Sequence, residues 1–195
     1  MKLSEEDQEI FTNPIFFQRK VHINNYIVSL LGKLNEQLEN DHLVQQVIAK
    51  FKLPLTRGKI SKGENYLGYP WQILDYPRVF EKENIFAFRT MCWWGNFYNS
   101  TLHIGGSYYE NHMETFSKKL QLLKDQPVYI CVNDKQWDHH FEINNYLLLK
   151  EVYANDDLFK KTLNQKFLKL SCKFPLDDIE HLQKNAIATF KLFLQ

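Results

Sequence analysis

Hydrophobic side chains in the first quarter of the chain recur at the spacing of an α-helix. Asn13 can cap a helix and Pro14 suits the first helical position, so a helix is expected to begin there. The apolar positions that follow are separated by three, four or seven residues and form one stripe: Phe16, Ile23, Ile27, Leu30, Leu34 and Leu38. The pattern predicts one long helix over about 14–38 and a shorter helix over about 42–51.

The middle of the chain has the hydrophobic pattern of strands. Residues 55–70 contain glycines and lysines without an apolar period, and are predicted to form an extended loop. A short strand is expected over 71–76. Residues 85–94 are apolar or aromatic at nearly every position, which is typical of a strand buried on both faces. Gly95-Asn96 has the composition of a two-residue hairpin turn, so a returning strand is predicted over 97–104.

The last third of the chain combines helix and strand patterns. A helix is predicted over 113–124, an apolar strand over 127–133, and a half-exposed strand over 168–174, where apolar and polar residues alternate. Asp177 can cap a final helix. The buried stripe of that helix is expected to contain Ile179, Leu182, Ala186, Phe190 and Phe193. Residues 134–157 show no period that assigns them to an element.

The order of these elements predicts an α+β fold. We expect a mostly antiparallel sheet built around a central β-hairpin at about 85–104, packed by an N-terminal helix and a C-terminal helix. A chain of 195 residues fits a single domain, 1–195. Within it, residues 1–53 are expected to form a helical N-terminal segment, and residues 55–195 a strand-rich body that ends in a helix.

Composition narrows the classes of function. The chain is 44% hydrophobic and 15% aromatic, which is an aromatic-rich version of an ordinary soluble globular protein. The net charge is only +1, so no broad field attracts nucleic acid or an anionic membrane. The three cysteines are too widely spaced for a disulfide framework. No secretory leader or membrane-spanning run is recognisable, and a cytoplasmic location is expected.

Aromatic residues are concentrated between Tyr66 and Tyr109, where 13 occur in 44 positions. Aromatic rings line many small-molecule pockets, so a site is expected in this stretch. If Gly95-Asn96 is the whole hairpin loop, Trp94 pairs with Phe97, and directly opposed residues share a face. That face then mixes rings with small polar groups: Phe86, Phe88, Thr90, Cys92, Trp94, Phe97, Asn99, Thr101 and His103.

This mixed face has two interpretations. Apolar surface with a few orienting polar groups is typical of a pocket wall, whereas a second core layer would let Thr and Asn side chains satisfy one another. A three-residue loop would shift the pairing and exchange the partners of both strands. The opposite face is mostly apolar and is expected to lie under the helices. Arg89 on that face needs an ion-pair partner, for which Asp75 and Glu64 are the candidates.

Candidate metal ligands occur without the spacing of a metal motif. Asp138, His140 and Glu142 would share one face of an extended segment, but the chain has no His-x3-His or Cys-x2-Cys pair. We interpret this run as an exposed surface and predict no metal site. Cys92 shares the predicted mixed face with His103, although a cysteine in a buried strand is more often a small apolar residue than a nucleophile.

Phosphate-binding features are also incomplete. Gly58 and Gly63 have the glycine spacing of a P-loop, but Glu64-Asn65 follow where Lys and Ser or Thr are required. The sequence therefore excludes a P-loop nucleotide triphosphatase. Basic residues in and near this loop could still contact an anion: Arg57, Lys59, Lys62 and Arg78.

The first hypothesis of function is a small cytoplasmic ligand-binding protein or enzyme with an aromatic-lined pocket on one hairpin face. Its binding residues would be Phe88, Thr90, Trp94, Asn99 and Thr101, joined by Arg78 and Lys62 from the loops. His103 would be the group that transfers a proton, because the pKa of imidazole lies near neutrality.

Two alternatives belong to other classes. A non-catalytic interaction module would use the aromatic residues as a partner surface, since aromatic residues dominate binding hot spots. A single-stranded nucleic-acid binder would stack bases on exposed rings, helped by the lysines between 160 and 173, but the balanced net charge argues against it. The sequence identifies no reaction, cofactor or oligomeric state.

Overall fold

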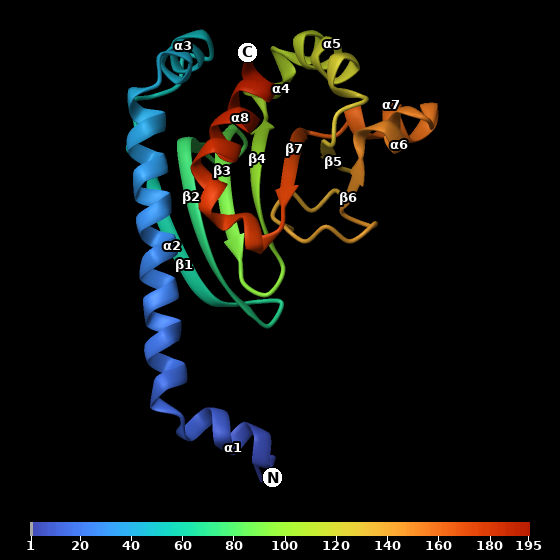
Figure 1. Cartoon of the computed structure of the whole chain (residues 1–195). Helices are drawn as coiled ribbons and strands as arrows, with labels where there is room; N and C mark the ends of the chain where they lie inside the picture. Colours follow the sequence, from blue (N-terminus) through green and yellow to red (C-terminus); the bar gives the residue numbers. More distant parts are fainter. Residues whose placement is uncertain (1) are drawn as a thin grey trace.

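A computed structural model of the protein, which describes residues 2–195, contains one sheet of seven antiparallel strands (Figure 1). The spatial order of the strands is β1-β2-β3-β4-β7-β5-β6. Their bounds are β1 (Lys59–Tyr66), β2 (Tyr69–Phe80), β3 (Ile85–Trp93), β4 (Phe97–Gly105), β5 (Tyr129–Cys131), β6 (Tyr146–Leu148) and β7 (Phe167–Phe174). The expected α+β fold, with an antiparallel sheet and helices from both ends of the chain, is confirmed.

Helices cover one face of the sheet and one of its ends (Figure 1). Their bounds are α1 (Glu5–Thr12), α2 (Pro14–Asn40), α3 (His42–Lys50), α4 (Ser107–Glu110), α5 (Met113–Leu123), α6 (Leu149–Tyr153), α7 (Asp156–Leu163), the 3-10 helix η1 (Leu176–His181) and α8 (Leu182–Leu194). The helices α2 and α8 contact each other and the same sheet face. Across the described residues, none of these helices has both the length and the apolar character needed to span a bilayer.

The long helix α2 begins as predicted. The Asn13 side chain accepts hydrogen bonds from the backbone N–H groups of Ile15 and Phe16, which satisfies two donors of the first turn. The second half of the apolar stripe, from Ile27 to Leu38, is buried against the sheet and α8. The first half of the stripe is exposed, because the sheet does not extend beneath it.

Two strands are longer than the sequence predicts. Residues 59–66, expected to be part of a loop, form the edge strand β1, which lacks an apolar run because its side chains are mostly exposed. The strand β2 continues past Pro77 to Phe80. Pro77 has no N–H for the ladder, and the register with β3 shifts between Asp75 and Arg78 at this position.

The predicted pairing of the central hairpin is wrong by one residue. The loop contains three residues, Trp94-Gly95-Asn96, so Trp93 pairs with Phe97 and the N–H of Asn96 donates to the Trp93 carbonyl. Side chains alternate along a strand, and a shift of one residue therefore moves every β4 side chain to the other face relative to β3.

The two faces of the hairpin are consequently redistributed. The helix-covered face carries Phe86, Phe88, Thr90, Cys92, Tyr98, Ser100, Leu102 and Ile104. The rings of Phe88 and Phe190 of α8 show the contact, with centroids 5.0 Å apart. The prediction that the face of Arg89 lies under the helices is therefore wrong, because the large apolar side chains of β4 pack on the helices together with Phe86 and Phe88.

Part of the opposite face, over β7 and the neighbouring strand β4, is covered by an irregular segment, residues 133–145, which we call the strap. The strap explains why β7 is buried on both faces from Phe167 to Cys172, where a half-exposed strand was predicted. Lys169 and Ser171 point away from the helices, yet only 1% and 0% of their surfaces are exposed. Two of the three polar positions of β7 are therefore buried under chain that is distant in sequence, whereas the third, Lys173, is exposed near the end of the strand.

The backbone conformation between β4 and α4 requires a glycine at position 106. Gly106 has φ +58°, and a Cβ at this position would lie 2.4 Å from the Glu83 carbonyl oxygen. We expect Gly106→Ala to lower the free energy of unfolding by about 2 kcal/mol, measured by urea denaturation. The matched control is Gly32→Ala inside α2, where a Cβ meets nothing within 4 Å. That change should stabilise the protein by about 0.5–1 kcal/mol, and equal effects at both glycines would contradict the prediction.

Candidate functional site

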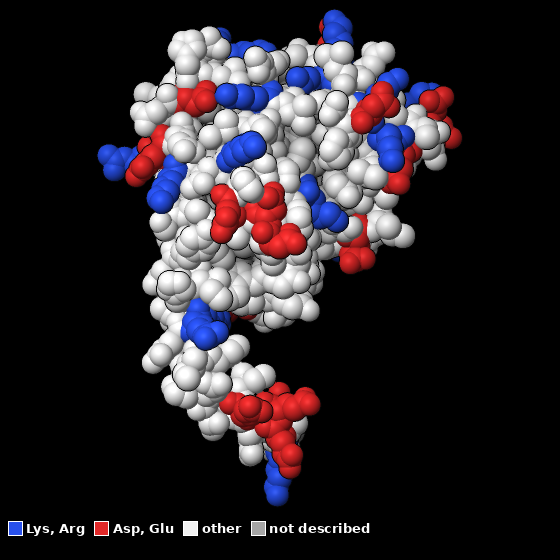
Figure 2. Space-filling model, viewed as in Figure 1, with Lys and Arg blue, Asp and Glu red and all other residues white. Residues whose placement is uncertain are grey.

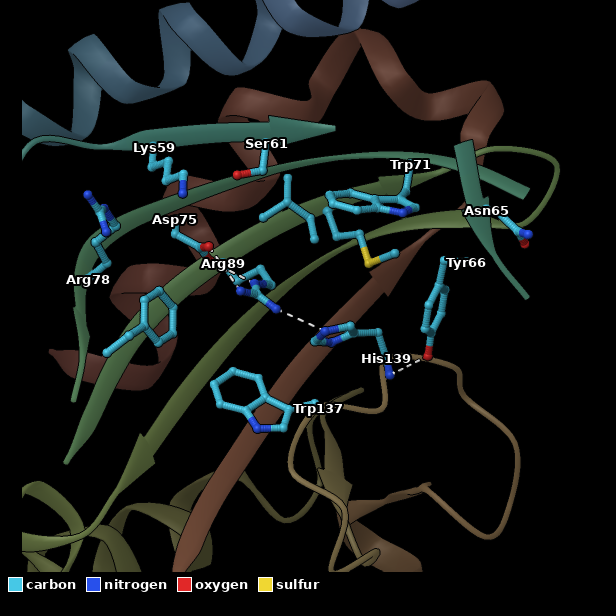
Figure 3. Close-up of a pocket in the computed structure, with 13 residues that line it drawn as sticks. Lys59, Ser61, Asn65, Tyr66, Trp71, Asp75, Arg78, Arg89, Trp137 and His139 are labelled. Atoms are coloured by element: carbon cyan, nitrogen blue, oxygen red, sulfur yellow. Dashed lines mark hydrogen bonds and ion pairs between the residues drawn. The ribbon is translucent and has the colours of Figure 1, made fainter. Parts of the chain in front are cut away.

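A pocket of about 520 Å³ lies on the strap side of the sheet, between the strands β1, β2 and β3 and the strap (Figure 3). Its wall contains four large aromatic side chains: Tyr66, Trp71, Phe80 and Trp137. The rings of Phe80 and Trp137 lie 6.0 Å apart between centroids and join the sheet to the strap. One side of the pocket is therefore closed by Phe80 of β2 and Trp137 of the strap, which are far apart in the sequence.

A buried ion pair forms part of the floor of this pocket. Two guanidinium nitrogens of Arg89 donate to the two carboxylate oxygens of Asp75, at 2.7 and 2.9 Å. The remaining nitrogen, Nη1, lies 2.9 Å from Nε2 of His139 (Figure 3). The ion pair between Arg89 and Asp75 is thus present, and a strap histidine completes the contacts of the guanidinium.

The contact with Arg89 determines which ring nitrogen of His139 carries the proton. Arginine can only donate, so Nε2 of His139 accepts and its ring proton is on Nδ1. Burial lowers the pKa of His139 well below 6.5, and the positive charges of Lys169 and Arg89 lower it further. His139 is therefore a neutral acceptor at pH 7 and is not positioned as a free acid or base.

Two more contacts attach the strap to the sheet. The Tyr66 hydroxyl accepts hydrogen bonds from the backbone N–H groups of His139 and His140, at 2.7 and 3.1 Å. The buried Lys169 amine donates to the carbonyl oxygens of Gln136 and Asp138, at 2.9 and 2.7 Å. Burial lowers the pKa of Lys169 from 10.5 to about 8.

His103 lies beneath the strap and does not line the pocket. Its ring is held between Trp137 and Phe167, with centroids 5.4 and 5.7 Å away. Burial lowers the pKa of His103 well below 6.5, with added effects of Lys169 and Arg89. The structure therefore places the proposed proton-transfer group where solvent does not reach it.

Asn99 and Thr101 share this covered face. The Asn99 amide donates to the Thr101 hydroxyl at 2.8 Å and to the Ser171 hydroxyl at 3.0 Å. The Thr101 and Ser171 hydroxyls are themselves 2.8 Å apart. These side chains hydrogen-bond one another between β4 and β7, as in the core-layer interpretation, although the buried Oδ1 of Asn99 has no partner in the part of the chain that the structure describes.

The other residues expected to bind a ligand lie in four separate places. Phe88 and Thr90 are buried under the helices, and Trp94 lines an apolar groove beside α2. Arg78 lines the pocket. Lys62 is on β1 and exposed, but the strand alternation directs Lys59 and Ser61, and not Lys62, into the pocket. The structure therefore brings one residue of the expected set, Arg78, together with the ion pair.

Most of the pocket residues were not selected from the sequence. Tyr66 and Trp71 belong to the aromatic concentration that pointed to this region, but their segment was assigned to a loop and a short strand. Trp137 and His139 lie in the strap, whose sequence has no period to assign. These residues come together because β1 pairs with β2, which aligns Lys59 with Asp75 and Gly63 with Trp71. The sequence pattern did not indicate this pairing.

Two other chemistries considered from the sequence have little support in the geometry. The ring of His140 lies 3.8 Å from the Asp138 carboxylate, but within residues 2–195 no three His, Cys, Asp or Glu side chains converge as a metal site requires. Burial raises the pKa of the Cys92 thiol to about 12, so it is protonated at neutral pH.

The charge of the pocket is positive. Lys59, Arg78 and Arg89 carry three positive charges against the single carboxylate of Asp75. Lys59 and Arg78 lie together at one end, and Trp71 and Tyr66 lie toward the other (Figure 3). Phe80 lies on the cationic side, where its ring centroid is 5.9 Å from the guanidinium carbon of Arg89. Comparison of the chain with protein-family models, curated proteins and solved structures gave no significant match.

Proposed function

We propose that the protein binds a small planar anion in the pocket between the sheet and the strap. The observation that carries the proposal is the separation of an aromatic part from a cationic end within one cavity. The volume of about 520 Å³ falls within the range of about 300–1,000 Å³ typical of small-molecule sites.

The aromatic part favours a flat ligand. Trp71 and Tyr66 come from the sheet, and Trp137 comes from the strap (Figure 3). Aromatic side chains bind flat rings by stacking or edge contacts, and they lose little conformational entropy because each has only two side-chain torsions. Trp137 is half-exposed, so binding would bury apolar surface that now faces solvent.

The cationic end favours a carboxylate or a phosphate on that ligand. Lys59 is exposed. Among the described residues, the Arg78 side chain makes one hydrogen bond, from Nε to the Arg57 carbonyl at 3.1 Å. The other guanidinium donors of Arg78 are therefore available for an anion, which arginine can bind through two parallel hydrogen bonds. Arg89 adds positive charge beneath them although Asp75 holds it in place.

The proposal is one of binding rather than of catalysis. His139 accepts from Arg89, and His103 is buried beneath the strap, so neither imidazole is placed to exchange a proton with an occupant of the pocket. We therefore propose a ligand-binding protein, as in the first hypothesis from the sequence. The site contains Arg78, one of the binding residues expected there.

The test is a calorimetric titration with aryl carboxylates and aryl phosphates, each compared with its uncharged amide or alcohol. We expect the planar anions to bind, and the affinity of each neutral partner to be lower by a factor of about ten or more. Lys59→Ala and Arg78→Ala should each weaken binding about tenfold, and Trp137→Ala at least as much.

Lys62→Ala is the matched control, because it removes a lysine from the same strand outside the pocket. It should leave the affinity unchanged. If Lys62→Ala weakens binding as strongly as Lys59→Ala, the anion is attracted by general surface charge. If no planar anion binds in the titration and none raises the melting temperature of the protein, the proposed function is wrong.

A further inference from the structure

We infer that the N-terminal arm, residues 3–26, pairs with the arm of a second copy of this chain. The arm contains α1 and the first half of α2, and it extends beyond the edge of the sheet (Figure 1). The Lys20–Glu64 ion pair and the hydrogen bond from Gln72 to Asn24 join α2 to β1 and β2 near the base of the arm. This inference does not depend on the proposed ligand.

The arm exposes more apolar surface than a solvated helix requires. Nine large apolar side chains on it are between 42% and 69% exposed: Leu3, Ile10, Phe11, Ile15, Phe16, Phe17, Val21, Ile23 and Tyr26. At roughly 200 Å² for each side chain, their exposed parts, which lie on more than one side of the arm, amount in total to on the order of 900 Å². The largest apolar patch of a typical monomer is about 300–600 Å², whereas each partner of a stable interface buries about 800 Å².

The exposed apolar side chains lie on more than one side of the arm, as they do in helices that are buried in an assembly. Phe16 and Ile23 continue the stripe that buries Ile27 against the sheet, so the exposed surface is an extension of the core face. Ile15 and Phe17 lie on other sides of the same turn, and a helix that is apolar on several sides is normally buried.

An apolar groove of about 180 Å³ adjoins the base of the arm. It runs between α2, the hairpin loop and η1, and its lining includes Ile23, Tyr26, Trp94, Leu176 and Ile179. The groove is large enough for an apolar side chain, and it is continuous with the exposed stripe. A partner arm that crosses the stripe therefore has a further surface against which to pack.

The charges of the arm are complementary to those of a second arm. The helix α1 carries Glu5, Glu6, Asp7 and Glu9, and no other carboxylate occurs before Glu36. Arg19 and Lys20 lie on the next part of the arm; Arg19 is exposed, whereas Lys20 is already paired with Glu64 of the same chain. Figure 2 shows the acidic cluster near the end of the arm, with a basic side chain beyond it at the tip and a basic patch above it. An antiparallel pair related by a twofold axis brings each acidic cluster to the basic cluster of the other copy.

The same charges argue against a lipid surface as the occupant. Amphipathic helices that bind anionic membranes carry Lys and Arg on their polar face. The polar residues of α1 are mainly acidic, so an anionic bilayer would repel the tip of the arm. The second copy therefore accounts for both the apolar area and the arrangement of charge.

Sedimentation equilibrium of the full chain tests this inference. We expect a mass of twice 23.4 kDa at about 100 µM, and dissociation on dilution below about 1 µM. Phe16→Glu with Phe17→Glu should give a monomer, with a circular dichroism spectrum and melting profile that show an intact fold. Arg19→Glu should weaken the dimer about tenfold, and about 0.5 M NaCl should reduce that difference because salt screens exposed charges.

The matched control is Leu122→Glu, which changes an apolar residue of α5 that is 76% exposed and distant from the arm. This variant should remain a dimer. A wild-type monomer at about 100 µM would overturn the inference, as would a dimer that survives both phenylalanine changes. Co-sedimentation of a monomeric wild type with phosphatidylcholine vesicles would identify a membrane as the occupant instead.

Discussion

Arg89→Met is expected to lower the free energy of unfolding by about 3–5 kcal/mol, which is the usual effect of removing one member of a buried ion pair. The side chains of Arg89 and Asp75 are 14% and 7% exposed, so the remaining Asp75 carboxylate would be buried without its counter-ion. The change also removes the contact with His139 that attaches the strap. Urea denaturation at pH 7.5 measures the difference.

Two comparisons identify the cause of that loss. Arg78→Met removes a half-buried arginine from the neighbouring strand, and it should change stability by less than about 1 kcal/mol. Arg89→Met combined with Asp75→Leu should be more stable than Arg89→Met alone, because no uncompensated charge remains. If the double variant is no more stable than Arg89→Met, the loss comes from packing and not from a buried charge.

The second large effect is expected at acidic pH. His103 and His139 have pKa values well below 6.5 in the folded protein, whereas in the unfolded chain they titrate near 6.5. The unfolded state therefore binds more protons below that value, and the free energy of unfolding falls as the pH falls. The stability that these groups contribute is complete above about pH 6.5 and is lost below it.

The magnitude follows from the number of protons. Between pH 7.5 and about pH 5.5, each buried imidazole should reduce the free energy of unfolding by about 1.4 kcal/mol. The two together should therefore reduce it by about 3 kcal/mol over this range. Urea denaturation at several pH values measures the slope.

Variants of single histidines separate the two contributions. His103→Leu should remove about half of the pH dependence, because its ring lies between Trp137 and Phe167. His42→Gln is the matched control for loss of a histidine, because His42 is exposed and lies outside both the strap and the N-terminal arm; it should keep the wild-type slope. If His103→Leu keeps the full pH dependence, burial of this imidazole is not a source of acid sensitivity.

Both effects concern the attachment of the strap. Arg89 contacts it through His139, and His103 lies against Trp137. Trp137 and His139 also line the pocket, so variants that loosen the strap are expected to weaken ligand binding as well. A stability measurement should therefore accompany each binding measurement, and affinity should be compared only among folded variants.

The sequence predicted well those features that depend on neighbours along the chain. The cap at Asn13, the helical period that follows it and the apolar run from Ile85 each depend on local hydrogen bonding or periodicity. The edge strand β1 was not recognised, because its exposed side chains carry no apolar pattern. Its existence depends on pairing with β2, which is a contact between segments and not a property of either segment.

The candidate site was predicted less well, for a related reason. The aromatic concentration includes Tyr66 and Trp71, which line the pocket, and Arg89 was recognised as a residue that needs a carboxylate. The face was assigned wrongly because the loop includes Trp94, and one additional residue reverses the orientation of Thr101 and His103 relative to β3. No local rule indicated that the strap would cover that face.

By itself, the sequence determined the long capped helix, the central hairpin and the α+β class, because helical period, strand alternation and turn composition act over a few residues. Only the tertiary structure decided which hairpin face is open, where the pocket lies and which half of the α2 stripe is buried. These outcomes depend on the strand register, the strap and the extent of the sheet. Each of them results from packing between residues that are far apart in the chain.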